Sequence, residues 1–157
     1  MRAVETTDAG LIRRAIVRNW RWVADDGSGA KEDFAPVLGE GLKYVLIEDR
    51  RPRAVFFYHV RNAITYEVHT CPFHGFRGPE AVAGARLSLG WMFDNTPCRK
   101  VITHVPSDNR LAYEFAKRAG MVDEGVNRLS FLKDGQLLDQ NVLGITSEEF
   151  RCQQQFR

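Results

Sequence analysis

The sequence has few of the features that mark secreted, membrane-spanning or disulfide-stabilised proteins. Its three cysteines, Cys71, Cys98 and Cys152, cannot all pair within one chain, so we expect reduced thiols. No stretch approaches the roughly 20 consecutive apolar residues of a transmembrane helix, and residues 1–5 lack the apolar run of a signal peptide. We therefore expect a cytoplasmic protein that does not contact a membrane.

A large surplus of one charge is also missing. Lysine and arginine together number 22 and aspartate and glutamate 20, a formal net charge of +2. Dedicated nucleic-acid binders usually carry a clustered basic surplus, so we expect no nucleic-acid partner. The 157 residues are 44% hydrophobic and 27% charged, which suits one globular domain. We predict a single domain over residues 1–146, followed by a C-terminal tail, residues 147–157, whose polar end frays.

Apolar periodicity and turn residues predict an alternation of strands and helices. The predicted strands cover 2–5, 42–47, 54–60, 64–70, 100–105, 126–132 and 136–145, and the predicted helices cover 8–22, 31–38, 79–95 and 109–119. Asp134-Gly135 between two strand-like runs is a hairpin signal. An antiparallel meander followed by a strand–helix–strand crossover predicts an α/β (α+β) domain with a mixed, mostly antiparallel central sheet flanked by helices.

Three short motifs lie beyond the strand predicted at 100–105: Asn109-x-x-Ala112, Gly120-Met121 and Glu124-Gly125. With the element order, they resemble the GCN5-related N-acetyltransferase (GNAT) family over residues 42–146, and the pattern is most similar to acetyltransferase-like proteins of bacteriophages and bacteria. The resemblance implies the acyl-CoA N-acyltransferase fold. It also implies acetyl transfer from acetyl-CoA to a primary amine of a small molecule or protein, by direct attack in a ternary complex.

The resemblance places CoA at the loop that enters the helix at 79–95. Free N–H groups at a helix N-terminus attract anions, and glycine lets the backbone approach a phosphate closely. Arg77-Gly78 is similar to the start of the family loop, whereas Glu80 stands where the family has glycine and would repel a pyrophosphate unless its side chain turns outward. An ordinary Gly-Pro helix start is the alternative. The candidate cofactor-binding residues are Thr70, Cys71, Gly75, Phe76, Arg77, Gly78, Glu80, Ala81 and Asn109.

Catalysis requires a group that removes a proton from the amine. Glu67 and His69 alternate along one strand, so their side chains face the same way. In relatives of the ribosomal-protein acetyltransferase type, a glutamate often lies ten residues before the loop arginine, and Glu67 and Arg77 keep this spacing. Glu67 is the first candidate base and His69 the second; a solvated polar strand face is the alternative. A strand N–H near residues 70–72 would stabilise the thioester oxygen.

Many relatives carry a tyrosine seven residues after the helix asparagine, and Ala116 occupies that position here. Tyr113 lies three residues earlier on a neighbouring part of the same helix face. It is either a substitute acid for the leaving thiolate or a half-buried core aromatic. Asn109 either contacts CoA or caps the helix.

Other interpretations of the polar residues remain open. His69-x-Cys71-x-x-His74, with His104, has the residue types of a metal site, but Pro72 and the lack of a second tight ligand pair argue against it, so we predict no metal. Nothing in the sequence indicates the lowered pKa that a Cys71 nucleophile would need.

The main rival to an enzyme is a catalytically inactive protein of the same fold that acts through protein–protein contacts. Ala116 and Glu80 both favour it. An exposed end strand would be compatible with a homodimer.

Four residues lie where the family's first helix and the following loop border the amine pocket: Trp20, Trp22, Asp25 and Asp26. Aromatic rings and carboxylates would suit a cationic acceptor. The alternative is one core tryptophan, one surface tryptophan and a solvated turn, which we favour for the two aspartates.

Overall fold

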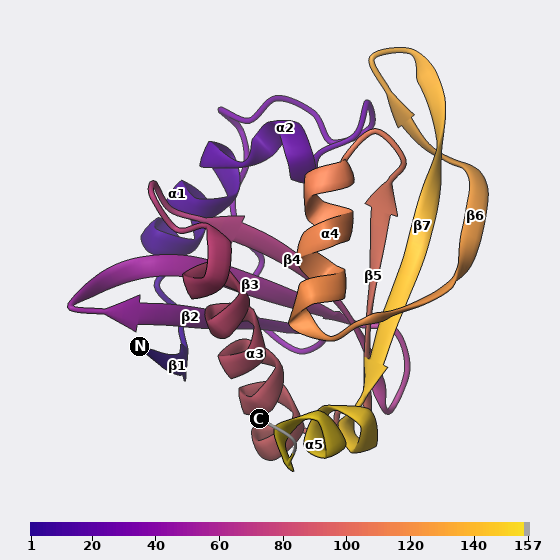
Figure 1. Ribbon diagram of the computed structural model, residues 1–157. Helices are drawn as coiled ribbons and strands as arrows, with labels where there is room; N and C mark the ends of the chain where they lie inside the picture. The colour runs from indigo at the N-terminus through magenta and orange to yellow at the C-terminus, as the bar shows by residue number, and fades with distance from the viewer. Residues whose placement is uncertain (156–157) are drawn as a thin grey trace.

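The computed structural model describes residues 1–155, and Figure 1 shows a central sheet with helices on both faces. Its seven strands run in the order β1-β2-β3-β4-β5-β7-β6. The elements are β1 (Arg2–Glu5), α1 (Ala9–Arg18), α2 (Trp20–Val23), β2 (Leu42–Asp49), β3 (Arg51–Val60), β4 (Thr65–Pro72), α3 (Gly78–Asn95), β5 (Lys100–Pro106), α4 (Arg110–Ala119), β6 (Val122–Lys133), β7 (Gln136–Thr146) and α5 (Ser147–Gln155). All neighbouring strands are antiparallel except β4 and β5, so the predicted mixed, mostly antiparallel sheet is confirmed.

Two apolar cores lie on opposite faces of the sheet. The larger is formed by α3, α4 and α5 with the residues of β2–β5 and β7 that face them, among them Phe56, Tyr58 and Val101. The smaller lies under α1 and contains Val55 and Cys71. Because side chains alternate across a strand, even-numbered residues of β3 and β4 face the larger core and odd-numbered residues face the smaller one. None of the described helices is both long enough and apolar enough to span a bilayer.

The first predicted helix is interrupted at Asn19, and α2 is a separate single turn. The Asn19 side-chain amide donates to Ala15 O (2.8 Å) and to Pro72 O at the end of β4 (3.0 Å). This tertiary contact holds the junction in a non-helical conformation, so the prediction of one continuous helix to Trp22 was wrong.

The helix predicted at 31–38 is also wrong, because this segment consists of turns and irregular chain. The Arg13 guanidinium on α1 donates to Phe34 O (2.9 Å) and Glu32 O (2.8 Å), and the Tyr44 hydroxyl donates to Val37 O (2.9 Å). These carbonyl groups are satisfied by side chains from outside the segment instead of by helical N–H groups.

The C-terminal tail, whose polar end was predicted to fray, instead forms α5 as far as Gln155, and residues 156–157 lie outside the described part of the chain. Thr146 and Glu149 form a reciprocal cap, in which Glu149 N–H donates to Thr146 Oγ1 (3.2 Å) and Thr146 N–H donates to Glu149 Oε2 (2.8 Å). The Thr-x-x-Glu spacing of a capping box was the sequence signal for this helix. Phe150 then packs against Phe93, with ring centroids 5.4 Å apart.

Replacing Phe150 with alanine is expected to destabilise the whole domain. The Phe150 side chain is 3% exposed, and its ring lies 4.9 Å from the Arg86 guanidinium carbon. Removing a buried phenylalanine costs about 3 kcal/mol of unfolding free energy. Urea titration followed by circular dichroism measures this change. Arg151→Ala, at an exposed position of the same helix, is the control, and a Phe150→Ala loss no larger than that of the control would show that α5 is not part of the folding unit.

Candidate functional site

The parallel pairing of β4 and β5 stops after three residue pairs. The register holds at Thr65↔Lys100, Tyr66↔Val101 and Glu67↔Ile102. One residue further, the Thr103 hydroxyl donates to Val68 O at 3.1 Å, so a side chain occupies the place where a backbone ladder would continue. β5 stays paired with β7 to its end, and a notch opens between β4 and β5.

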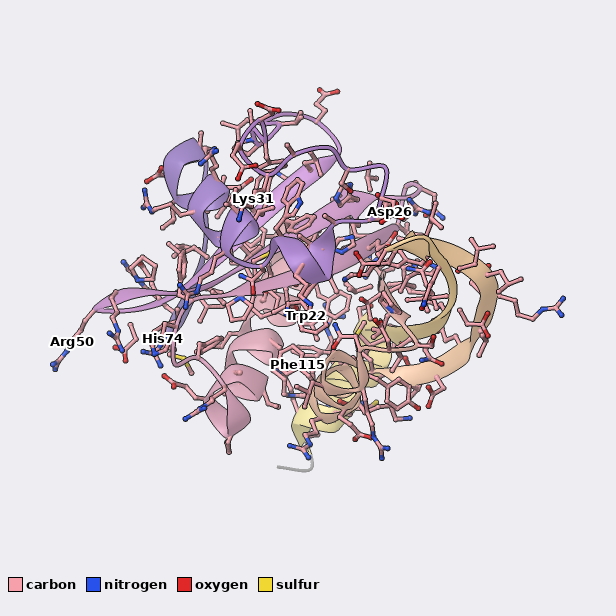
Figure 2. All side chains as sticks on the ribbon, turned by 90° about the horizontal axis from the view of Figure 1, so that it is seen from above. Trp22, Asp26, Lys31, Arg50, His74 and Phe115 are labelled. Atoms are coloured by element: carbon pink, nitrogen blue, oxygen red, sulfur yellow. The ribbon has the colours of Figure 1, made fainter. Side chains whose placement is uncertain are left out.

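This notch is a cavity of about 110 Å³ that passes from one face of the sheet to the other. On the side of the large core it is lined by α4, including Ala112 and Phe115, and on the opposite side by Trp22 and Val23 of α2. In Figure 2, Trp22 and Phe115 lie in the middle of the molecule, between α1–α2 and α3–α4. We call this space the β4–β5 cavity.

One backbone N–H of β4 points into the notch. Phe73 N–H donates to Arg53 O on β3 (2.9 Å), whereas Val68 O is bonded from β5. Backbone groups alternate in direction along a strand, so the N–H of Thr70, two residues after Val68, is directed toward β5. Thr70 also lines the cavity. Its N–H is placed to donate to an oxygen bound there.

The predicted base Glu67 lies next to the cavity in a cluster of basic side chains. Its carboxylate is 8% exposed. Its Oε1 is 2.9 Å from His104 Nδ1 and 3.9 Å from His69 Nε2, and its Oε2 is 3.4 Å from Arg61 Nε. An ionised carboxylate only accepts hydrogen bonds, so His104 Nδ1–H is the donor in this contact. His69 and His104 line the cavity, whereas Glu67 is not among the lining residues.

Burial lowers the pKa of His69 to about 4, although the Glu67 charge acts in the opposite direction. The ring of His69 stacks on Phe57, with centroids 4.6 Å apart. Burial also lowers the pKa of the neighbouring His59, against the opposing effect of Glu67. Both imidazoles are therefore neutral at pH 7, and burial makes each a weaker base than a free imidazole.

The loop before α3 has the features of an anion-binding cradle. Gly75 (φ 79°) and Gly78 (φ 62°) adopt left-handed conformations, and an added Cβ at either would meet no atom within 4 Å. The helix has no side-chain cap at Arg77, so its first N–H groups have no side-chain acceptor there. Phe76 between them is buried and packs against Gly84, which fixes the loop on the sheet.

The Glu80 carboxylate is bound on the sheet side of the loop. It accepts from Arg53 on β3 at 2.5 Å, and Arg53 lies over the Phe76 ring with its guanidinium carbon 5.4 Å from the centroid. The negative charge that the sequence placed near a pyrophosphate is thus paired with a buried cation. Arg77 is exposed beside the loop.

Two residues of α4 have the structural roles that the sequence left as alternatives. Asn109 is the N-cap, and its side chain accepts from Ala112 N–H at 3.1 Å while it also lines the cavity. The Tyr113 hydroxyl donates to Asp123 at the start of β6 at 2.8 Å. The structure therefore brings Asn109 to the cavity and directs the Tyr113 hydroxyl toward β6.

Cys71 and His74 do not join His69 in a common site. Cys71 is fully buried in the small core, and burial raises its pKa to about 12. His74 lies beside Arg18, with 3.4 Å between His74 Nδ1 and the guanidinium. Within residues 1–155, no three histidine, cysteine, aspartate or glutamate side chains are arranged to hold a metal ion.

The tryptophans and aspartates of the α2 region separate into different roles. Trp20 packs against the small core, whereas Trp22 is 48% exposed. Asp26 lies in an exposed turn, as expected. It also accepts from Asp134 N–H (2.8 Å) and Gly135 N–H (2.9 Å) at the tip of the β6–β7 hairpin, partners that lie more than a hundred residues away in the sequence.

Sequence reasoning missed three members of the Glu67 cluster. His59 pairs in register with Glu67 across β3 and β4, and the short predicted hairpin between these strands was the available signal. Arg61 follows in the turn of the same hairpin. His104 was considered only as a metal ligand, because the register of a parallel crossover is not encoded locally.

Comparison with known proteins shows the fold. A scan against protein-family models finds no match, and a search of curated proteins finds none either. A mutant of spermidine N-acetyltransferase SpeG from Vibrio cholerae matches with a TM-score of 0.77 and 14% identity over 98% of this chain and 99% of that one. The spermidine N-acetyltransferase from Vibrio cholerae in complex with CoA and spermine matches with a TM-score of 0.75 and 16% identity, over 96% of this chain and 96% of that one.

A GNAT-family acetyltransferase from Bacillus anthracis matches with a TM-score of 0.70 and 15% identity, over 94% of this chain and 96% of that one. The chain therefore has the GNAT acetyltransferase fold, and the fold expected from the sequence is confirmed.

The burial of Cys71 and Cys98 predicts that only one thiol reacts in the native protein. Burial raises the pKa of Cys98 to about 11 and that of Cys71 to about 12, and the thiolate is the reactive form. Cys152 is exposed. Titration with Ellman's reagent at pH 8 should release one equivalent rapidly from the native protein and three in denaturant. Cys152→Ser should abolish the rapid equivalent; a rapid equivalent from Cys71 would contradict the assignment of a core thiol.

Proposed function

We propose that this protein is an acetyl-CoA-dependent N-acetyltransferase that transfers the acetyl group directly to a primary amine. The observation that carries this proposal is the position of the Glu67–histidine cluster at the β4–β5 cavity, on a strand whose end leads into the cradle of α3. Proton acceptor, oxygen-binding N–H and anion cradle follow one another along residues 67–81. Acyl transfer to an amine requires all three.

The α3 cradle is the proposed binding site for the pyrophosphate of acetyl-CoA. The N–H groups of the first helical turn and the exposed Arg77 supply positive potential, and Gly75 and Gly78 permit close approach of the backbone. The pantetheine arm would then follow the notch toward Thr70, with Asn109 on its other side.

The imidazoles at the cavity are the proposed proton acceptors, and Glu67 positions them. An incoming ammonium loses a proton to His104, whose positive charge the Glu67 carboxylate stabilises. His69 is the weaker of the two acceptors, because burial lowers its pKa. The amine nitrogen then forms a bond to the thioester carbon, and the developing oxygen charge is met by the Thr70 N–H. The carbon–sulfur bond breaks, the attacking nitrogen loses its second proton, and the departing CoA thiolate takes that proton up to leave as a thiol. The imidazolium then releases the first proton to solvent. In this assignment Glu67 orients the base and stabilises its positive charge, whereas the sequence favoured Glu67 as the base itself.

A homodimer and other protein partners remain predictions from the sequence. The expected homodimer would use β6, which forms an edge of the sheet and exposes Val126 and Leu129. The same edge would serve the rival function, an inactive protein that acts through protein contacts.

Isothermal titration with acetyl-CoA tests the cradle. Micromolar binding is expected for the wild type, and Arg77→Glu should weaken it at least tenfold, or about 1.4 kcal/mol, because the substitution places a negative charge beside the phosphates. Arg51→Glu makes the same charge change at an exposed position on β3 and should bind as the wild type does. Absence of binding in the wild type would refute the enzyme and favour the rival.

The pH dependence of turnover tests the cluster. Glu67→Gln should lower kcat about a hundredfold at pH 7, since an amide cannot stabilise the protonated imidazole. Raising the pH deprotonates the amine in solution, so the deficit should shrink toward pH 10. A merely structural defect would give a deficit that does not depend on pH. Glu48→Gln, which changes a surface ion pair with Arg2, is the control.

A further inference from the structure

A second cavity lies on the α1 side of the sheet, outside the β4–β5 cavity. It has a volume of about 300 Å³ and is bounded by α1, α2, the irregular segment that follows them, β2 and β3. Four aromatic rings line it: Trp20, Phe34, Tyr44 and Phe57. Trp20 and Phe34 lie with ring centroids 5.4 Å apart, and Tyr44 and Phe57 lie 6.3 Å apart. We call this space the aromatic cavity.

The two hydroxyl groups of the aromatic cavity already have partners. The Tyr44 hydroxyl donates to Val37 O (2.9 Å), and the Ser28 hydroxyl donates to Asp25 Oδ1 (2.7 Å). The other lining residues are apolar except His59, and the lining contains no carboxylate. The ring faces attract a cation, but an ammonium group held among them would gain no ion pair in exchange for its lost hydration, which is costly.

The aromatic cavity adjoins the β4–β5 cavity at one end. Val23 lines both. His59, which lines the aromatic cavity, meets His69 edge to face with ring centroids 5.4 Å apart. Phe57 lines the aromatic cavity as well and stacks on His69. The charged and proton-accepting groups thus lie at one end of an otherwise apolar space.

We propose that the aromatic cavity holds the side group of the amine acceptor, and that this acceptor is a primary amine with one flat apolar group, an arylalkylamine, and not a polyamine. The inference rests on the proposed acetyl transfer. The volume of the aromatic cavity lies at the lower end of the range of small-molecule pockets. Planar rings pack well against aromatic side chains. With the ring among Trp20, Phe34 and Phe57, the amino group would extend past His59 and Val23 toward Glu67, where its positive charge is paired before the proton is lost.

The test compares two amines in steady-state turnover with saturating acetyl-CoA. Phenethylamine carries one ring and one amine, whereas spermidine carries three amines and no ring. We expect kcat/KM for phenethylamine to exceed that for spermidine at least tenfold. Phe34→Ala should raise KM for phenethylamine at least fivefold and leave KM for acetyl-CoA unchanged. Leu38→Ala, an exposed position in the same segment and outside the lining, is the control.

The outcomes separate the acceptor inference from the proposed function. Equal or better turnover of spermidine, or a Phe34→Ala variant with unchanged KM for phenethylamine, would overturn the inference and leave acetyl transfer standing. Calorimetric binding of the two amines to the wild type provides a readout that does not depend on turnover. Failure to bind acetyl-CoA would remove the proposed function, and failure to bind phenethylamine more tightly than spermidine would remove the acceptor inference.

Discussion

The separation of β4 from β5 is the constraint on which the rest of the site depends. A parallel pair that continued past Glu67 and Ile102 would fill the sheet with backbone hydrogen bonds and leave no passage between its faces. The Thr103 hydroxyl instead ends the ladder at Val68, and β5 follows β7. The resulting notch is lined by Thr70 of β4, by α4 on one face and by α2 on the other.

The polar cluster at this notch depends on the same divergence. A buried carboxylate is costly unless it is hydrogen-bonded or paired, and Glu67 meets this requirement with side chains from three elements: His104 on β5, Arg61 in the β3–β4 turn and His69 on β4. Burial keeps His69 neutral. This arrangement of a carboxylate and neutral imidazoles suits an amine, which would bind as an ammonium ion and react after losing a proton. The aromatic cavity beside His59 would provide an apolar surface for the rest of such a molecule.

Much of the fold could be predicted because its signals are local. The strand runs, the Asp134-Gly135 turn and the Gly120 helix end each reflect interactions within a few residues, and all were found where they were expected. The helix wrongly predicted at 31–38 has the opposite character. Residues 31–38 are not helical because the Arg13 guanidinium binds carbonyl groups of this segment. The hydrogen bonds from the hairpin tip to Asp26 were not predicted either, because the two partners are distant in the sequence. The α5 helix was missed although its capping signal, Thr146-x-x-Glu149, is local.

The sequence by itself determined which residues share a strand face, since side chains alternate with a period of two, and so it placed Glu67 beside His69. It also determined that glycines and proline open α3, and that an acidic residue stands in the first turn of that helix. Only the tertiary structure decided what those residues meet. His104 and His59 reach Glu67 through strand pairings, and Arg53 reaches Glu80 from β3. Strand register and the packing of helices on a sheet are set by contacts summed over the whole chain, which no local pattern contains.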